Sequence, residues 1–470
     1  MKKNKFVTST IILVIGGLIT KILSMFIRIV MTRYVGSYGI GIYMLLAPTF
    51  GLLISICTLG MPTAISKLVS EDKKNNKKII FNASSFVILI DILIMFLVYI
   101  FAGFIANNLL HEPKTYYGIL SMGIVLPFIS ISSILRGYFF GKQKMLPHVV
   151  TNIVEDIVRL ISIVLFVPFC LNKGIEFAVA FLVLSNVFSE LASIIIFLIL
   201  LPKKINKNDI KPDKSYLKDI LDISLPSTGS RLIGNIGLFF EPIILTFVLI
   251  KVGYSNEFII NEYGVLTGFV MPLILLPSFF TMAISQALLP IVSNSYSNNN
   301  KKYVSKKIKQ SIFFSLLIGI PCTLIFVFIP DIPLNLIYNT NQGVHYIRVL
   351  AVVCLLHYIQ SPLTSSLQGM GLAKSAMRGT LIGMILRTLT LFVFSFLKIG
   401  LWGLVISTSI NIIYVTIHHI VVVRSKLKDS SLTWILEYLS VDVFIDLFII
   451  WKLVFILNLT NNTNHHNYLF

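Results

Sequence analysis

Long uncharged apolar segments run through the whole chain, and they limit its fold more than any other feature. Segments rich in Ile, Leu, Val and Phe and about 20 residues or more in length can cross a hydrocarbon core roughly 30 Å thick. Hydrophobic residues make up 56% of the 470 residues and charged residues only 13%, and the mean hydropathy is +0.87. A soluble domain cannot bury so much apolar surface, so we expect an integral membrane protein.

The apolar segments predict an all-α polytopic membrane protein with thirteen spans. The start of the chain carries lysines like a signal peptide, but the apolar stretch behind it continues to Met31 without a small-residue cleavage site, so we interpret it as the first span. The predicted spans are 8–32, 40–66, 79–105, 116–140, 148–170, 175–201, 222–250, 263–292, 310–330, 346–371, 377–397, 401–423 and 432–457.

Basic residues gather in every second loop. If the N-terminus is cytoplasmic, the inside segments hold 26 Lys and Arg, and the outside segments hold five, namely Arg33, Lys114, Lys173, Lys251 and Lys398. Cytoplasmic loops of membrane proteins carry such an excess, so we expect a multi-pass protein of the bacterial cytoplasmic membrane with a cytoplasmic N-terminus. The same placement explains the net charge of +19 without a nucleic-acid partner.

Short motifs repeat between the two halves. Tyr38-Gly39 opens the second predicted span and Tyr263-Gly264 opens the eighth, and Ser132–Gly137 (SSILRG) is similar to Thr364–Gly369 (TSSLQG). Parallel repeats of this kind predict two six-helix lobes related by a pseudo-two-fold axis along the membrane normal, with a cavity between them. The expected parts are an N-terminal lobe at 1–205, a cytoplasmic linker at 206–221, a C-terminal lobe at 222–424, and an extra C-terminal helix and tail at 425–470.

The sequence shows no catalytic or metal-binding spacing. The eight histidines form no HExxH motif, no GxxxxGK[ST] phosphate loop occurs, and the predicted outside loops are short. The four cysteines form no CxxC pair, and we interpret them as packing residues. We therefore expect a protein that is not an enzyme and that uses neither a cofactor nor a metal ion.

Cations inside two predicted spans are the strongest candidates for a binding site. At helical spacing, Lys21, Ser24 and Arg28 fall on one face of the first span, and Arg231 and Asn235 fall on one face of the seventh. A charge costs roughly 2.5–3.5 kcal/mol at the centre of a membrane helix unless it faces protein or water. Since these are the first helices of the two halves, we expect their polar faces to meet across the central cavity.

Paired cations with no acid in the first span suit an anionic ligand such as a pyrophosphate, because Arg forms bidentate charged hydrogen bonds with phosphate and Lys acts as a point charge. In the alternative interpretation, Lys21 and Arg28 extend to opposite membrane interfaces. Arg231 would then pair with Glu241 or another buried acid.

Other intramembrane charges admit a structural or a coupling role. Glu155, Asp156 and Arg159 lie in the fifth predicted span, where Glu155 and Arg159 are one turn apart and can form an ion pair. We favour structural pairing for them and for Arg387, although a buried acid could couple transport to protons.

Several motifs resemble the stage V sporulation protein B and polysaccharide flippase family. Residues 20–28 (TKILSMFIR), continuing to 43, resemble the first-helix signature of that family, and residues 59–67 (LGMPTAISK) resemble the end of its second helix. Residues 135–139 (LRGYF) and 367–369 (LQG) are similar to its repeated turn motifs. The resemblance covers most of the chain and is most specific in the first 70 residues.

The resemblance implies two six-helix lobes with extra C-terminal helices, within a superfamily of multidrug and oligosaccharidyl-lipid exporters. It also implies that cations of the first and seventh helices bind a lipid-linked pyrophosphate, a role that falls on Lys21, Arg28 and Arg231. The chain departs from the family near its C-terminus, where only one strongly apolar stretch follows residue 430 instead of the two that complete fourteen spans.

Together these features favour a flippase that moves a polyprenyl-pyrophosphate-linked saccharide, such as lipid II or a cortex precursor, by alternating access. Its partners would be that anionic glycan, membrane lipids and enzymes of cell-wall synthesis. The alternatives are a cation-coupled multidrug exporter of the same superfamily, a membrane-embedded glycosyltransferase or ligase, and a scaffold for cell-wall enzymes. The short outside loops argue against the enzyme.

Overall fold

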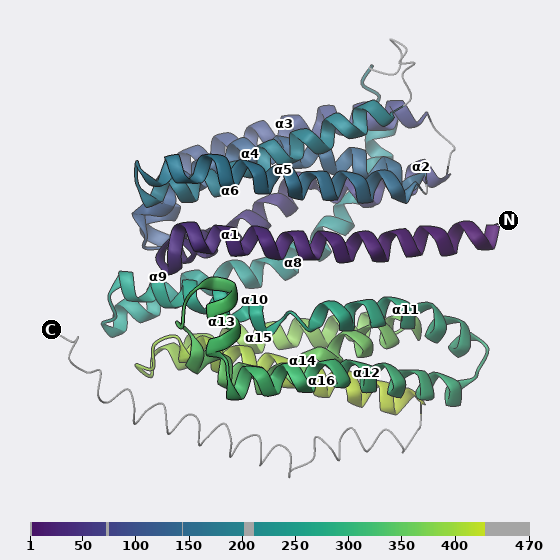
Figure 1. Ribbon diagram of the computed structural model, residues 1–470. Helices are drawn as coiled ribbons and strands as arrows, with labels where there is room; N and C mark the ends of the chain where they lie inside the picture. Colours follow the sequence, from purple (N-terminus) through teal and green to yellow (C-terminus); the bar gives the residue numbers. More distant parts are fainter. Residues whose placement is uncertain (1, 72–74, 143, 202–210, 428–470) are drawn as a thin grey trace. The chain divides into compact units, whose positions relative to one another are not determined.

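The computed structural model describes residues 2–71, 75–142, 144–201 and 211–427, and every regular element in these ranges is a helix (Figure 1). The all-helical prediction is therefore confirmed. The predicted thirteenth span at 432–457 lies outside the described residues. The number of spans and the arrangement as two six-helix lobes stay predictions.

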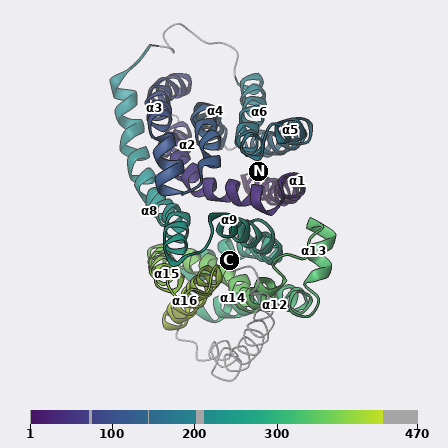
Figure 2. The same ribbon diagram turned by 90° about the vertical axis from the view of Figure 1, so that its left-hand side faces the viewer.

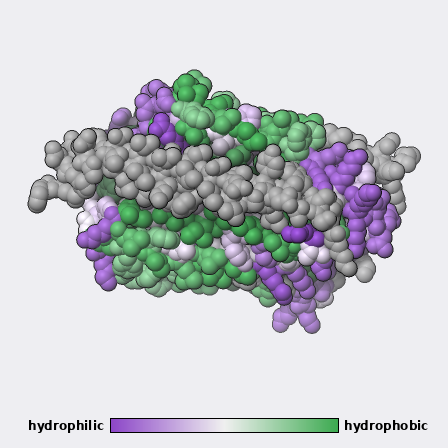
Figure 3. Space-filling view, turned by 90° about the horizontal axis from the view of Figure 1, so that it is seen from below, coloured by the Kyte–Doolittle hydropathy of each residue, from purple (hydrophilic) through white to green (hydrophobic). Residues whose placement is uncertain are grey.

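Ten helical segments of the described chain are long and apolar enough to cross a membrane. The first of them, Ile15–Glu71, covers most of the predicted span 8–32 and all of the predicted span 40–66. Helix α5 (Met145–Leu171) is not among the ten, because Glu155, Asp156 and Arg159 interrupt its apolar sequence. On the face seen in Figure 3, hydrophobic residues gather between hydrophilic residues at the two ends of the helices, as expected for a protein embedded in lipid.

Helix α1 (Lys2–Thr58) joins the first two predicted spans through a kink at Gly36. The kink needs φ 66° and ψ −173°, a conformation that glycine adopts at little cost. The predicted span at 40–66 contains a break, because Leu59 and Gly60 take positive φ angles and separate α1 from α2 (Met61–Glu71). A Cβ atom on Gly60 would lie 2.7 Å from the carbonyl oxygen of Ser224, so a glycine also allows close packing there.

Helices α3 (Asn76–Phe104), α4 (Tyr116–Gly141), α5 and α6 (Ile175–Leu200) lie at the predicted third to sixth spans. A π-helix at Ile105–Leu109 and a short 3-10 helix at Pro113–Thr115 connect α3 to α4. Helix α1 packs against α4, α5 and α6, which lie beside it in the end-on view of Figure 2. At Gly16 the approach is so close that a Cβ atom would collide with Val149 of α5.

Helix α8 (Lys214–Val252) follows the lysine-rich loop and packs on α1, α2 and α3. The prediction of one span at 263–292 is wrong. The chain there forms α9 (Asn256–Gly264), a π-helix (Val265–Val270), α10 (Met271–Ile274) and α11 (Ser278–Ser297). Pro272 and Pro277 fall in these breaks, where a proline cannot donate the backbone hydrogen bond of a continuous helix.

The chain divides into two compact units, Met1–Gly264 and Val265–Phe470. In the second unit, α12 (Lys301–Phe328), α14 (Val344–Gly369), α15 (Ala373–Ser395) and α16 (Trp402–Leu427) occupy the predicted ninth to twelfth spans, and a short α13 (Asp331–Tyr338) was not predicted. Helix α14 packs against α11, α12 and α16. The predicted boundaries at 205, 221 and 424 stay predictions.

The two repeated Tyr-Gly motifs meet within the first unit. A Cβ atom on Gly264 of α9 would collide with the backbone of Ser37 and Gly41 of α1. A Cβ atom on Gly41 would collide with the carbonyl group of Ile260. Glycines therefore allow α1 and α9 to cross with their backbones in contact.

An ion pair fixes the start of α8 to the start of α3. Asp213 caps α8 by accepting a hydrogen bond from the backbone N–H of Ser215, and its Oδ2 accepts another from Nζ of Lys78 at 2.6 Å. The ammonium group of Lys78 also lies over the ring of Tyr216, 4.9 Å from its centroid. The hydrogen bond from Lys78, together with the cap, lowers the pKa of Asp213 below its usual value.

This ion pair predicts a pH-dependent stability. Since the folded pKa of Asp213 is lowered, its stabilising effect is present above the unfolded pKa of about 3.9 and is lost as the pH falls through the folded pKa. We expect Asp213→Asn to lower the melting temperature of the detergent-solubilised protein at neutral pH, and this difference to vanish in strong acid. Lys78→Ala should lower the melting temperature in the same pH-dependent way, whereas the neighbouring Lys77→Ala should leave it unchanged. A difference that persists unchanged in acid would contradict the account.

Candidate functional site

The polar face predicted for the first span exists on α1. Lys21 and Ser24 are exposed and Arg28 is half-buried. The hydroxyl group of Ser24 donates to the carbonyl oxygen of Thr20 at 2.8 Å, so it is turned back onto its own helix. Lys21 and Arg28 are the groups of this face that carry positive charge, and their role in ligand binding stays a prediction.

The polar face of α8 contacts the second part of α1. Nη2 of Arg231 donates to the hydroxyl oxygen of Thr58 at 3.3 Å. Nδ2 of Asn235 donates to Oγ of Ser55 at 2.5 Å and to the carbonyl oxygen of Gly51 at 3.3 Å. These contacts with the segment 51–58 were not anticipated from the sequence. The expectation that this face meets the polar face of Lys21 and Arg28 stays a prediction.

Arg231 has no acidic partner among the described residues. Arg231 is exposed, and within the described ranges its guanidinium group donates a hydrogen bond to a neutral hydroxyl group. Glu241, the acid considered for it, instead accepts a hydrogen bond from the phenol of Tyr263 at 3.4 Å. The alternative interpretation, in which Glu241 neutralises Arg231, thus finds no support in these contacts.

A buried carboxylate that sequence reasoning missed joins three segments of the first unit. Glu112 is 3% exposed, and its Oε2 accepts hydrogen bonds from the phenol of Tyr38 at 3.3 Å and from Nδ2 of Asn256 at 2.9 Å. Tyr38 and Tyr263, which belong to the repeated motif, therefore each donate to a glutamate. That repeat was the available signal, but the spacing does not reveal which acid each tyrosine contacts.

The acids of α5 have partners different from those predicted. Oε2 of Glu155 forms an ion pair with Nη2 of Arg136 on α4 at 2.9 Å, and Nη2 of Arg159 donates to the phenol of Tyr43 on α1 at 3.3 Å. The predicted ion pair between Glu155 and Arg159 is therefore wrong. Neighbouring helices supply closer partners than the next turn of the same helix.

A mixed-charge network extends from this ion pair. Asp156 lies within electrostatic range of Lys21 on α1 as well as Arg136 and Arg159. Glu190 of α6, 8% exposed, lies within range of the same two arginines. The network brings together charges of both signs from α1, α4, α5 and α6, so most of its members have a structural counter-charge. Arg387, predicted with this group, is half-buried on α15 in the second unit.

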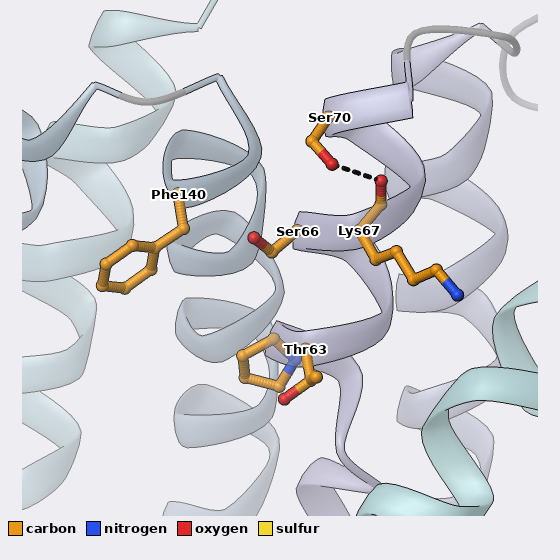
Figure 4. Close-up of a pocket in the computed structure, with 6 residues that line it drawn as sticks. Thr63, Ser66, Lys67, Ser70 and Phe140 are labelled. Carbon is orange, nitrogen blue, oxygen red and sulfur yellow. Dashed lines mark hydrogen bonds between the residues drawn. The ribbon is translucent and has the colours of Figure 1, made fainter. Parts of the chain in front are cut away.

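A polar pocket lies where α2 passes α4 (Figure 4). Its volume is about 550 Å³, and it is lined by Pro62, Thr63, Ser66, Lys67, Ser70 and Phe140. Figure 4 shows Ser66 directed towards the side of Phe140, whereas the side chain of Lys67 extends to the other side of α2. None of the predicted site residues lines this pocket.

Among the described residues, no group of three His, Cys, Asp or Glu could hold a metal ion. The four cysteines are free, and Cys57 and Cys354 are buried.

Solved structures and family sequence models show which fold and which family the chain matches. The solved structure of an inward-facing multidrug resistance MATE family transporter of the MOP superfamily has the same fold, with a TM-score of 0.67 and 16% identity over 88% of this chain and 95% of that one. The sequence model of the family described as polysaccharide biosynthesis protein matches residues 6–296, and the MatE model matches residues 263–393.

Two curated proteins are similar in sequence to this chain over most of its length. Stage V sporulation protein B of Bacillus subtilis (strain 168) is 35% identical over 444 residues, which are 92% of this chain and 86% of that protein. Lipid II flippase MurJ of the same organism is 23% identical over 429 residues, which are 82% of this chain and 76% of that protein. The chain belongs to the polysaccharide biosynthesis protein family. The resemblance read from its motifs is thus confirmed.

The ion pair between Arg136 and Glu155 predicts coupled stability effects. Both side chains are about three-quarters buried, with 26% and 21% exposed, so removing one leaves the other charge poorly solvated. Arg136→Gln or Glu155→Gln should each lower the free energy of unfolding by about 1–3 kcal/mol, and the double variant by less than the sum. Glu71→Gln on the exposed end of α2 is the control. Additive losses in a double-mutant cycle would refute the pairing.

Proposed function

We propose that the chain is a flippase that moves a polyprenyl-pyrophosphate-linked saccharide across the cytoplasmic membrane by alternating access. The observation that carries the proposal is Arg231, an exposed cation on a membrane helix with no acidic partner among the described residues. A charge at that place is stabilised by water or by an anionic ligand. A pyrophosphate provides the oxygens that a guanidinium group binds in pairs.

The relatives support this substrate class. Two of them are named as a sporulation protein and a lipid II flippase, and the matching family is described by polysaccharide biosynthesis. Lipid II or a cortex precursor would meet the requirement for an anionic head group on a polyprenyl tail. Enzymes of cell-wall synthesis would then supply the substrate and consume the product.

The binding site of the proposal consists of Lys21, Arg28 and Arg231, with Ser24 and Asn235 at its edge. Asn235 holds α8 against α1 through Ser55, which keeps the guanidinium group of Arg231 beside Thr58. The excess of lysines in every second loop supports a cytoplasmic N-terminus. Substrate would then reach the cations from the side where the lipid-linked saccharide is made.

A cation-coupled multidrug exporter is the second candidate. It is favoured by the MATE-like fold and by the acids Glu155 and Asp156 beside Lys21. These acids already have arginine neighbours, however, and an exporter of cationic drugs would not leave an arginine unneutralised at its binding surface.

Complementation of a strain depleted of its lipid II flippase tests the proposal. The wild-type chain should restore growth, whereas Lys21→Ala and Arg231→Ala should fail at matched membrane levels. Loss of a charged hydrogen bond worth about 1.5–3 kcal/mol lowers affinity about tenfold or more. Arg231→Lys should retain part of the activity because the charge remains.

Lys251→Ala is the matched control, because Lys251 lies at the other end of α8, with its ammonium group over the ring of Phe247. It should complement like the wild type. Failure of the wild type despite correct insertion would favour another polyprenyl-linked glycan or the exporter. Rescue by both alanine variants would refute the proposed binding site.

A further inference from the structure

Asp91 is an acid placed in the middle of a membrane helix. It is the one acidic residue of α3, and it lies on the buried face of that helix with Val87, Ile94 and Val98. Its exposed fraction is 0%. The other faces of α3 carry exposed apolar side chains such as Leu89, Leu93 and Phe96, which suit lipid. Asp91 is therefore sealed inside the protein at mid-helix depth.

Neutral groups surround the carboxyl group. Its Oδ1 accepts a hydrogen bond from the hydroxyl group of Ser130 on α4 at 3.1 Å, and the thiol of Cys57 on α1 lies close enough to interact with it. Its Oδ2 is buried and has no hydrogen-bond partner. Neither neighbour carries a positive charge.

The charged residues of the helices that pack on α3, which include Lys21, Arg28 and Arg33 of α1 and Asp219, Asp222 and Glu241 of α8, are not among the groups that contact the carboxyl group of Asp91. Helix α4 contributes Arg136, which pairs with Glu155, and α8 contributes Arg231, which donates to Thr58. On α2, Lys67 and Glu71 are exposed near its end. Within the described part of the chain, the side chains in direct contact with the carboxyl group of Asp91 that can stabilise its charge are those of Cys57 and Ser130, and neither is a counter-charge.

An ionised carboxylate in this place would be a buried charge without a counter-charge, which proteins avoid by protonation. A proton on Oδ2, the oxygen without a hydrogen-bond partner, converts it into a hydroxyl group and removes the negative charge of the side chain. The geometry thus favours a neutral carboxylic acid, formed when the carboxylate takes up one proton.

The segment that touches Asp91 also holds the candidate cation site. Cys57 lies between Ser55 and Thr58, and these two residues accept the hydrogen bonds of Asn235 and Arg231. One short stretch of α1 therefore contacts the acid and the substrate-binding cation. A negative charge on Asp91 would oppose the binding of an anion at Arg231, and a proton would remove that opposition.

We propose that Asp91 is a proton-binding site coupled to the anion site at Arg231, so that the protein binds the pyrophosphate group better with Asp91 protonated. The coupling between Asp91 and anion binding at Arg231 rests on the proposed function, whereas proton binding by Asp91 does not. Because linkage is reciprocal, an anion bound at Arg231 would in turn favour protonation of Asp91.

Difference infrared spectroscopy on the full chain in lipid nanodiscs tests the proton site. Between acidic and alkaline buffer, the wild type should show the carbonyl band of a buried protonated carboxyl group. Asp91→Asn should lack this band, Asp91→Glu should shift it, and the exposed control Asp222→Asn should retain it. A band that is unchanged in Asp91→Asn, or absent from a folded wild type at every pH, would overturn the assignment.

Binding of undecaprenyl pyrophosphate across the same pH range tests the coupling. The wild type should bind it more weakly as the pH rises, while Asp91→Asn, which imitates the neutral acid, should retain its affinity. Equal pH dependence in both proteins would overturn the coupling. If the wild type does not bind this lipid at any pH, the proposed function fails, and the infrared result still decides the proton site.

Discussion

A charge inside a membrane helix must face protein, water or a ligand, and this constraint organises the first unit of the structure. Arg231 satisfies it through the hydroxyl group of Thr58 alone, without a counter-charge from the described residues. The contacts of Asn235 with Ser55 and Gly51 hold α8 at the distance where that guanidinium group stays exposed. The helix packing thus presents a cation where an anion can bind.

The other intramembrane charges are arranged differently from Arg231. Arg136, Glu155, Asp156, Arg159 and Glu190 share one mixed network between α4, α5 and α6. Such a network holds the helices together through mutual charge pairing. Lys21 lies within electrostatic range of Asp156, so it connects the network to the polar face of α1. Charge balance therefore distinguishes Arg231 from the arginines of the network.

The apolar segments were sufficient to predict an all-helical membrane protein and the positions of most helices, because segment length and hydropathy are local properties. The exact positions of the breaks at Gly60 and in the segment 265–277 could not be predicted, since a glycine or proline in an apolar run can bend a helix or be tolerated in it. The partner of Glu155 was also missed. An i,i+4 pair is visible in a sequence, whereas a partner on another helix depends on the packing.

The central claim is that the chain moves a pyrophosphate-linked polyprenyl saccharide with Arg231 as a binding cation. Its most direct test is transport of a fluorescent lipid II analogue by the purified protein in proteoliposomes, with the label on the outer surface reported by a membrane-impermeant quencher. The account predicts movement by the wild type and by Lys251→Ala, and loss of movement in Arg231→Ala at equal reconstitution. Equal transport by Arg231→Ala and the wild type would contradict it.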